Sequence, residues 1–83
     1  MGARLRFEYD SVGDILYVDT TPPHDENMMR EVAEGVLLRV NLLTEGIDGL
    51  EVHGFMARSA SGSVIEAPIL AAFTQPAPAV RGA

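Results

Sequence analysis

Residues 7–18, Phe-Glu-Tyr-Asp-Ser-Val-Gly-Asp-Ile-Leu-Tyr-Val, constrain the fold of this chain more than any other stretch. Two runs of apolar and aromatic residues are joined by the Ser-Val-Gly of residues 11–13, with Asp10 and Asp14 on either side. Alternating apolar positions separated by polar turn residues are typical of a β-hairpin. Residues 15–18 are apolar throughout, so we expect the second strand to carry apolar side chains on both faces.

Size and composition limit the class of protein. The chain has 83 residues, enough for one small domain whose core is only marginally stable unless a metal, a disulfide or a partner chain helps. It has no cysteine, which excludes disulfides, thiolate chemistry and thiolate zinc sites. The first residues lead into an alternating pattern and not a continuous apolar segment. We therefore expect no signal peptide, no membrane span and a cytoplasmic location.

The charge pattern argues against nucleic acid as a partner. The formal net charge is -6, every positive residue is arginine, and residues 8–26 contain six acids and no base. A phosphate backbone is bound by clustered cations, which this stretch lacks. An acidic surface keeps a small protein in solution, and it could also attract a basic protein.

The pattern of apolar residues predicts a mainly β (α+β) fold, an antiparallel β-meander of about five strands with a short C-terminal helical element. Residues 28–34 have helical propensity, but we prefer a strand because Gly35, at a positive φ, would end it in a tight turn. The prolines and polar residues of 20–27 predict a mobile loop, and Gly49 is a candidate for a β-bulge. The expected strands are residues 4–10, 14–20, 28–34, 36–42 and 47–53, with a turn at 43–46.

The C-terminal third is less regular. Residues 55–60 could form one or two helical turns, and residues 64–73 are apolar enough to pack, with Pro68 either in the first turn of a helix or interrupting an edge strand. The Ala/Pro-rich residues 74–83 should be disordered. We therefore expect one domain over residues 1–73, followed by a disordered tail at 74–83.

The combination Tyr9-Asp10, Asp14-Ile15-Leu16-Tyr17-Val18, Arg30-Glu31-Val32, Glu34-Gly35-Val36 and Gly49-Leu50-Glu51-Val52 resembles the small bacterial and archaeal family named domain of unknown function 2283. The resemblance covers about residues 5–60. It implies an antiparallel meander with a short helix, and no activity is established for the family. The signature positions of the turn and sheet are Tyr9, Asp10, Asp14, Leu16, Tyr17 and Gly35.

Asp10, Asp14, Asp19, His24 and Asp25 are the densest group of metal-ligand residue types, but their spacing fits no EF-hand. We expect Asp10 and Asp14 to cap the turn by accepting backbone N–H groups, and we expect no metal and no cofactor.

Other side chains carry little chemistry. His24 is expected to be a solvated loop residue and His53 to end a strand. The sequence identifies no nucleophile that either histidine would activate. Tyr9 and Tyr17 are expected to lie within cross-strand reach of each other and to stabilise the sheet.

These patterns favour a non-enzymatic protein-interaction or self-assembly module. A single sheet of about five strands, apolar on both faces, is one layer where a stable domain needs two, so we expect a homodimer with two-fold symmetry. Two alternatives stay open. One is an antitoxin-like antidote to a basic toxin-like protein, and the other is a small metal-binding domain or metal-dependent enzyme.

Overall fold

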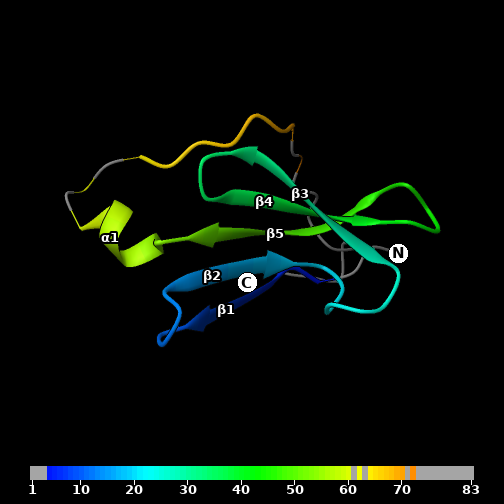
Figure 1. Cartoon of the computed structure of the whole chain (residues 1–83), viewed down its shortest axis with the longest axis horizontal. Helices are drawn as coiled ribbons and strands as arrows, with labels where there is room; N and C mark the ends of the chain where they lie inside the picture. The colour runs from blue at the N-terminus through cyan, green and yellow to red at the C-terminus, as the bar shows by residue number, and fades with distance from the viewer. Residues whose placement is uncertain (1–3, 61, 63, 71, 73–83) are drawn as a thin grey trace, which may run out of the picture.

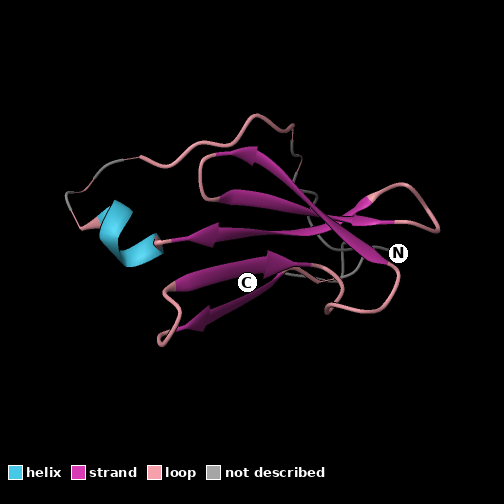
Figure 2. Cartoon of the chain, in the orientation of Figure 1, coloured by secondary structure: helices cyan, strands magenta, loops and turns pink. Residues whose placement is uncertain are grey.

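The computed structural model describes residues 4–60, 62, 64–70 and 72 (Figure 1). One antiparallel sheet of five strands is followed by one short helix, as Figure 2 shows, so the predicted mainly β fold is confirmed. The elements are β1 (Arg6–Asp10), β2 (Ile15–Asp19), β3 (Asn27–Ala33), β4 (Val36–Asn41), β5 (Ile47–His53) and α1 (Phe55–Ser59). The preference for a strand over residues 28–34 was therefore right.

The strand order is β1-β2-β5-β4-β3, which is not a single meander. Only β3, β4 and β5 run as a meander, and β5 then lies beside β2 of the first hairpin (Figure 1). This pairing sets Leu16 opposite Val52 and Val18 opposite Leu50. The largely exposed strand β3 is left at the edge, and β5 offers β2 an apolar partner at each of these positions.

The register divides the sheet into two unlike faces, since residues paired across strands point the same way. The apolar face carries Phe7, Tyr9, Leu16, Val18, Met28, Val36, Leu38, Val40, Ile47, Leu50 and Val52, with Arg30 at the β3 edge. The polar face carries Arg6, Glu8, Asp10, Ile15, Tyr17, Asp19, Asn27, Met29, Glu31, Leu37, Arg39, Asn41, Gly49, Glu51 and His53. Strand β2 carries apolar side chains on both faces, as expected, with Leu16 and Val18 on one and Ile15 and Tyr17 on the other. The expectation that the whole sheet is apolar on both faces was wrong, because Ile15, Tyr17 and Leu37 stand among charged and amide side chains.

Burial on the apolar face falls from β4 toward β1. Val36, Leu38 and Val52 are buried on β4 and β5, and Leu16 and Val18 on β2 are half-buried. Phe7 on β1 is 67% exposed, and Leu5 and Tyr9 are exposed beside it. The core is therefore small and lies off-centre, and the β1 side of the apolar face is open.

The C-terminal segment differs from its prediction. Helix α1 covers five of the six residues expected to be helical, but residues 64–70 and 72 form neither a helix nor a strand. Within them Ile65, Ala67 and Ile69 are half-buried while their neighbours are exposed. The predicted disordered tail, residues 74–83, lies outside the described residues. No helix in the described part of the chain is long and apolar enough to cross a membrane.

Candidate functional site

A row of charged side chains crosses four strands of the polar face. The guanidinium of Arg39 on β4 donates from Nη2 to Oδ2 of Asp19 on β2 at 2.8 Å, and Arg6 on β1 donates from Nη1 to Oδ1 of Asp19 at 2.8 Å. Arg39 is only 1% exposed and Asp19 only 3% exposed. A buried carboxylate and guanidinium are tolerated when they neutralise each other in this way.

Gly49 makes this row possible. It lies on β5 between the two charged residues, opposite Arg39 on one side and Asp19 on the other. A Cβ at this position would lie 2.4 Å from Cβ of Asp19 and 2.7 Å from the carbonyl oxygen of Val18. The missing side chain therefore leaves the space through which Arg39 reaches a residue two strands away.

Hydrogen bonds tie the loop between β2 and β3, for which the sequence predicts mobility, to the polar face. Nη1 of Arg39 donates to the carbonyl oxygen of Thr21 at 2.7 Å. The backbone N–H of Thr20 donates to the carbonyl oxygen of Asp48 at 2.9 Å. Nε2 of His24 lies 2.9 Å from Oδ2 of Asp48. His24 is thus a half-buried anchor and not the solvated residue that we expected.

Asp48 reaches this loop because of an irregularity in the sheet. Arg39 pairs with Gly49 and Val40 with Ile47, so the extra residue of the bulge is Asp48 and not Gly49, where the sequence predicted it. Its Oδ2 accepts hydrogen bonds from Nδ2 of Asn27 at 3.0 Å and of Asn41 at 3.1 Å. These hydrogen bonds lower the pKa of Asp48 below its usual range. The bond from Asn27 has the largest effect, followed by the bond to His24.

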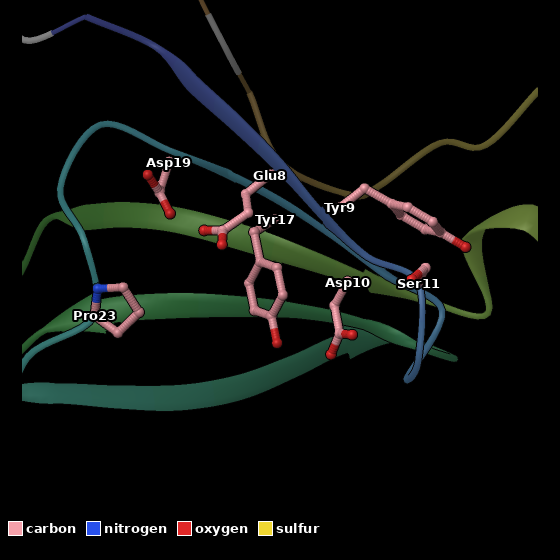
Figure 3. Close-up of a pocket in the computed structure, with 7 residues that line it drawn as sticks. All are labelled: Glu8, Tyr9, Asp10, Ser11, Tyr17, Asp19 and Pro23. Carbon is pink, nitrogen blue, oxygen red and sulfur yellow. The ribbon is translucent and has the colours of Figure 1, made fainter.

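The polar face is hollowed near the first hairpin. An open pocket of about 510 Å³ is lined by Glu8, Tyr9, Asp10, Ser11, Tyr17, Asp19 and Pro23. Figure 3 shows Glu8, Asp10, Tyr17 and Asp19 on the same side of the hairpin, with the ring of Tyr9 extending away from them. The pocket thus combines carboxylates with a tyrosine ring, and a cationic group is the chemistry that such a lining favours.

The two tyrosines do not meet, which corrects the expectation of a cross-strand pair. Tyr9 is opposite Leu16 on the apolar face, whereas Tyr17 is opposite Glu8 on the polar face. The ring of Tyr9 packs instead against Phe55 of α1, with centroids 6.1 Å apart and planes tilted by 60°. The pKa of Tyr17 is raised, mainly by burial and secondly by the negative charge of Glu51.

Asp10 and Asp14 have different tasks. Oδ1 of Asp10 accepts the N–H of Val12 at 3.0 Å and of Gly13 at 3.2 Å, which is the predicted turn cap. Asp14, at a φ of 57°, turns its carboxylate away from the turn and toward α1, where Oδ1 accepts the N–H of Met56 at 2.8 Å. The expectation that Asp14 also caps the turn was therefore wrong.

Asp14 also binds the hydroxyl of Tyr9, which donates to Oδ1 at 2.6 Å. This hydrogen bond raises the pKa of Tyr9 to about 12 and lowers the pKa of Asp14. Each partner favours the protonation state that keeps the bond: a neutral phenol and a charged carboxylate.

The remaining signature residues serve the sheet. Leu16 is half-buried on the apolar face between Tyr9 and Val52. Gly35 has the predicted positive φ, 74°, and a Cβ there would overlap the guanidinium of Arg58. Arg58 donates from Nε to the carbonyl oxygen of His53 at 2.9 Å and from Nη2 to that of Glu34, so it ties α1 to the turn after β3.

The carboxylates that the sequence singled out form structural contacts. No three or more His, Asp and Glu side chains of the described residues are grouped so that they could hold a metal ion. The carboxylate of Asp10 instead accepts hydrogen bonds from the turn, that of Asp14 from α1, and that of Asp19 from arginine. His53 lies 3.0 Å from Glu51, and no nucleophile is hydrogen-bonded to either histidine within this part of the chain.

Sequence reasoning missed Arg39, Asp48 and Arg58. Arg39 could have been found, because it is the one charged residue in the apolar run of residues 36–40 and must find a buried partner or leave the core. Asp48 and Arg58 carried no such signal, since their partners lie in other elements.

Comparisons with known proteins add no relative. A scan against protein-family models found no match, and searches of curated proteins and of solved structures found none either. The resemblance to the domain of unknown function 2283 family stays a prediction from the sequence.

Proposed function

We propose that this protein is a non-enzymatic protein-interaction module that self-associates as a two-fold dimer through the open β1 side of its apolar face. The observation that carries this proposal is the exposure of Phe7, at 67%, on the same face whose residues Val36, Leu38 and Val52 on β4 and β5 are buried. Leu5 and Tyr9 are also exposed, so the open apolar surface follows one strand.

The small core supports the same conclusion. Val36, Leu38 and Val52 are the buried apolar residues of the described chain. A single sheet with so small a buried core gains stability when a second chain buries part of its exposed apolar surface, because association is linked to folding. A contiguous apolar surface on a small protein is also typical of an interaction site.

The test is the mass of the protein in solution. Light scattering at micromolar concentration should give twice the chain mass of 8.9 kDa. Phe7→Asp should convert the dimer to a monomer because it places a charge in the apolar contact. The matched control is Val12→Asp, which replaces an apolar residue by the same charge in the β1–β2 turn, at a residue 97% exposed, and should leave the dimer intact. A monodisperse 8.9 kDa monomer of the unsubstituted protein would overturn the proposal.

A second candidate function is that of an antidote to a basic toxin-like protein, and the acidic pocket favours it. Glu8 and Asp10 line this pocket in a chain of net charge -6, while the third carboxylate of the pocket, that of Asp19, is neutralised by Arg39 and Arg6. The partner would be the product of an adjacent gene encoding a basic toxin-like protein. Calorimetry with that protein should show micromolar or tighter binding, weakened at least tenfold by Glu8→Gln, and no binding would dismiss this candidate.

A further inference from the structure

We infer that the dimer forms by antiparallel pairing of β1 with β1 of a second copy, centred on Phe7, so that the two sheets join into one. This inference rests on the self-association proposed above and specifies where it occurs. β1 is the first strand of the sheet and pairs, among the described residues, only with β2. Its outer edge therefore presents backbone N–H and C=O groups to which another strand can bond.

The residues of this edge are complementary to themselves. In an antiparallel pair centred on Phe7, the two phenylalanines face each other and Leu5 faces Tyr9. On the polar face, Arg4 meets Asp10 and Arg6 meets Glu8, each pair occurring twice across the axis. Opposite charges placed directly across two strands stabilise the pairing, and apolar side chains extend the apolar face into the second copy.

Charge also selects this register over its neighbours. A slip of two residues in one direction puts Arg6 opposite Arg6, and a slip in the other puts Glu8 opposite Glu8. A slip of one residue sets the apolar face of one copy beside the polar face of the other. The register centred on Phe7 is the one that joins like faces with no like charges opposed.

The participating side chains are accessible. Arg6 holds Asp19 through Nη1, while its Nη2 lies 3.8 Å from Glu8 of the same chain. The side chain of Arg6 is 42% exposed and that of Glu8 69% exposed, so both can be reached by a second copy. In the dimer, Arg6 and Arg4 of the second copy face Glu8 and Asp10, two of the carboxylates that line the pocket.

The opposite edge of the sheet is less suited to this pairing. The register of β3 against β4 shifts between Glu31 and Ala33, so Val32 is an extra residue that interrupts the strand. Bulges of this kind discourage edge-to-edge association. β1 pairs with β2 without interruption over its whole length.

Disulfide trapping tests the register, since the natural chain has no cysteine. Directly opposed residues of an antiparallel pair have Cα atoms about 4.5–5.5 Å apart, within the range of a disulfide. Phe7→Cys should therefore cross-link to itself under mild oxidation. Leu5→Cys alone should not, because its counterpart lies about 14 Å away along the strand. A mixture of Leu5→Cys and Tyr9→Cys chains should cross-link.

A charge reversal gives a second readout that needs no oxidation. Glu8→Arg sets arginine against Arg6 of the second copy and should weaken dimerisation at least tenfold. Glu45→Arg, the same change in the turn between β4 and β5, should not. Circular dichroism on each variant confirms that the sheet is retained before association is compared.

The outcomes separate this inference from the proposal beneath it. If light scattering shows a dimer while Phe7→Cys fails to cross-link, or Leu5→Cys cross-links as readily, the β1 register is wrong and self-association stands. If the unsubstituted protein is a monomer, both are overturned. A dimer with the cross-linking pattern above and a weakened Glu8→Arg variant supports both.

Discussion

The hydroxyl of Tyr9 donates a 2.6 Å hydrogen bond to Oδ1 of Asp14, the same oxygen that accepts the backbone N–H of Met56 at 2.8 Å. The carbonyl oxygen of Asp14 also accepts the N–H of Gly54 at 2.8 Å. Asp14 thus provides the cap that α1 lacks in its own sequence, since Gly54 at the helix start has no side chain to supply it. Asp14 and the packing of Tyr9 against Phe55 together hold the first hairpin and the helix in contact.

Asp14→Asn should lower the pKa of Tyr9 from about 12 toward the ordinary value of about 10, because the hydrogen bond to the Asp14 carboxylate is the largest cause of the shift. Absorbance of the tyrosinate band during alkaline titration measures it. Asp25→Asn removes a charge from the exposed loop and should leave the curve unchanged. An unaltered curve for Asp14→Asn would contradict the role given to this bond.

The same bond makes the protein sensitive to alkali. The folded-state pKa of Tyr9 is raised, so the stabilisation is fully present below about pH 10 and is lost as pH rises toward 12. Thermal unfolding midpoints should fall over this range in the unsubstituted protein and should change less in Tyr9→Phe. Equal falls in both would show that another group is responsible.

Acid should destabilise the fold through Asp48 and Asp14. Both have a lowered folded-state pKa, so their stabilisation is present above the unfolded value near 4 and disappears as pH falls through the folded values. Melting curves from pH 7 to pH 3 should show a declining midpoint. Asp48→Asn should start from a lower midpoint at pH 7 and decline less, whereas Asp25→Asn should follow the unsubstituted protein.

Gly49→Ala should destabilise the protein by about 1–3 kcal/mol, the usual cost of forcing extra volume into a packed site. The new methyl group would lie 2.4 Å from Cβ of Asp19 and would push β5 from β2. Urea unfolding measures the change. Gly46→Ala is the matched control, because the nearest atom to its new methyl group is Oγ1 of Thr44 at 3.3 Å. Equal effects at the two glycines would argue against the close approach.

Asp19→Ala should cost about 3–5 kcal/mol, since it leaves the buried guanidinium of Arg39 without its counter-charge. Asp25→Ala, which removes a carboxylate from an exposed position outside this ion pair and outside β1, should change the free energy of unfolding by no more than about 0.5 kcal/mol. Replacing both partners, as Asp19→Leu with Arg39→Met, should recover much of the loss because no unpaired charge stays buried. Without such recovery, the loss at Asp19 has some cause other than the ion pair.

The sequence by itself determined the elements. The bounds of β5 match the predicted residues 47–53, and β1, β2, β3 and β4 lie within about two residues of their predictions. These features follow from alternation along the chain, from the prolines after β2 and from the positive φ that Gly35 permits, and all of them act between near neighbours. The turn cap of Asp10 is local in the same way, because its partners are two and three residues away.

Only the tertiary structure decided how the elements combine and which side chains meet. Strand order depends on which strand pairs best with the free edge of β2. The alternation of side chains along a strand does not decide this, because every strand has the same period of two. The contacts that define the polar face join residues far apart in the chain, such as Arg39 with Asp19 and His24 with Asp48. The same holds for Asp14, whose carboxylate binds an amide 42 residues away. Such contacts depend on the register and the bulge at Asp48, which are properties of the assembled sheet and have no counterpart in any single stretch of sequence.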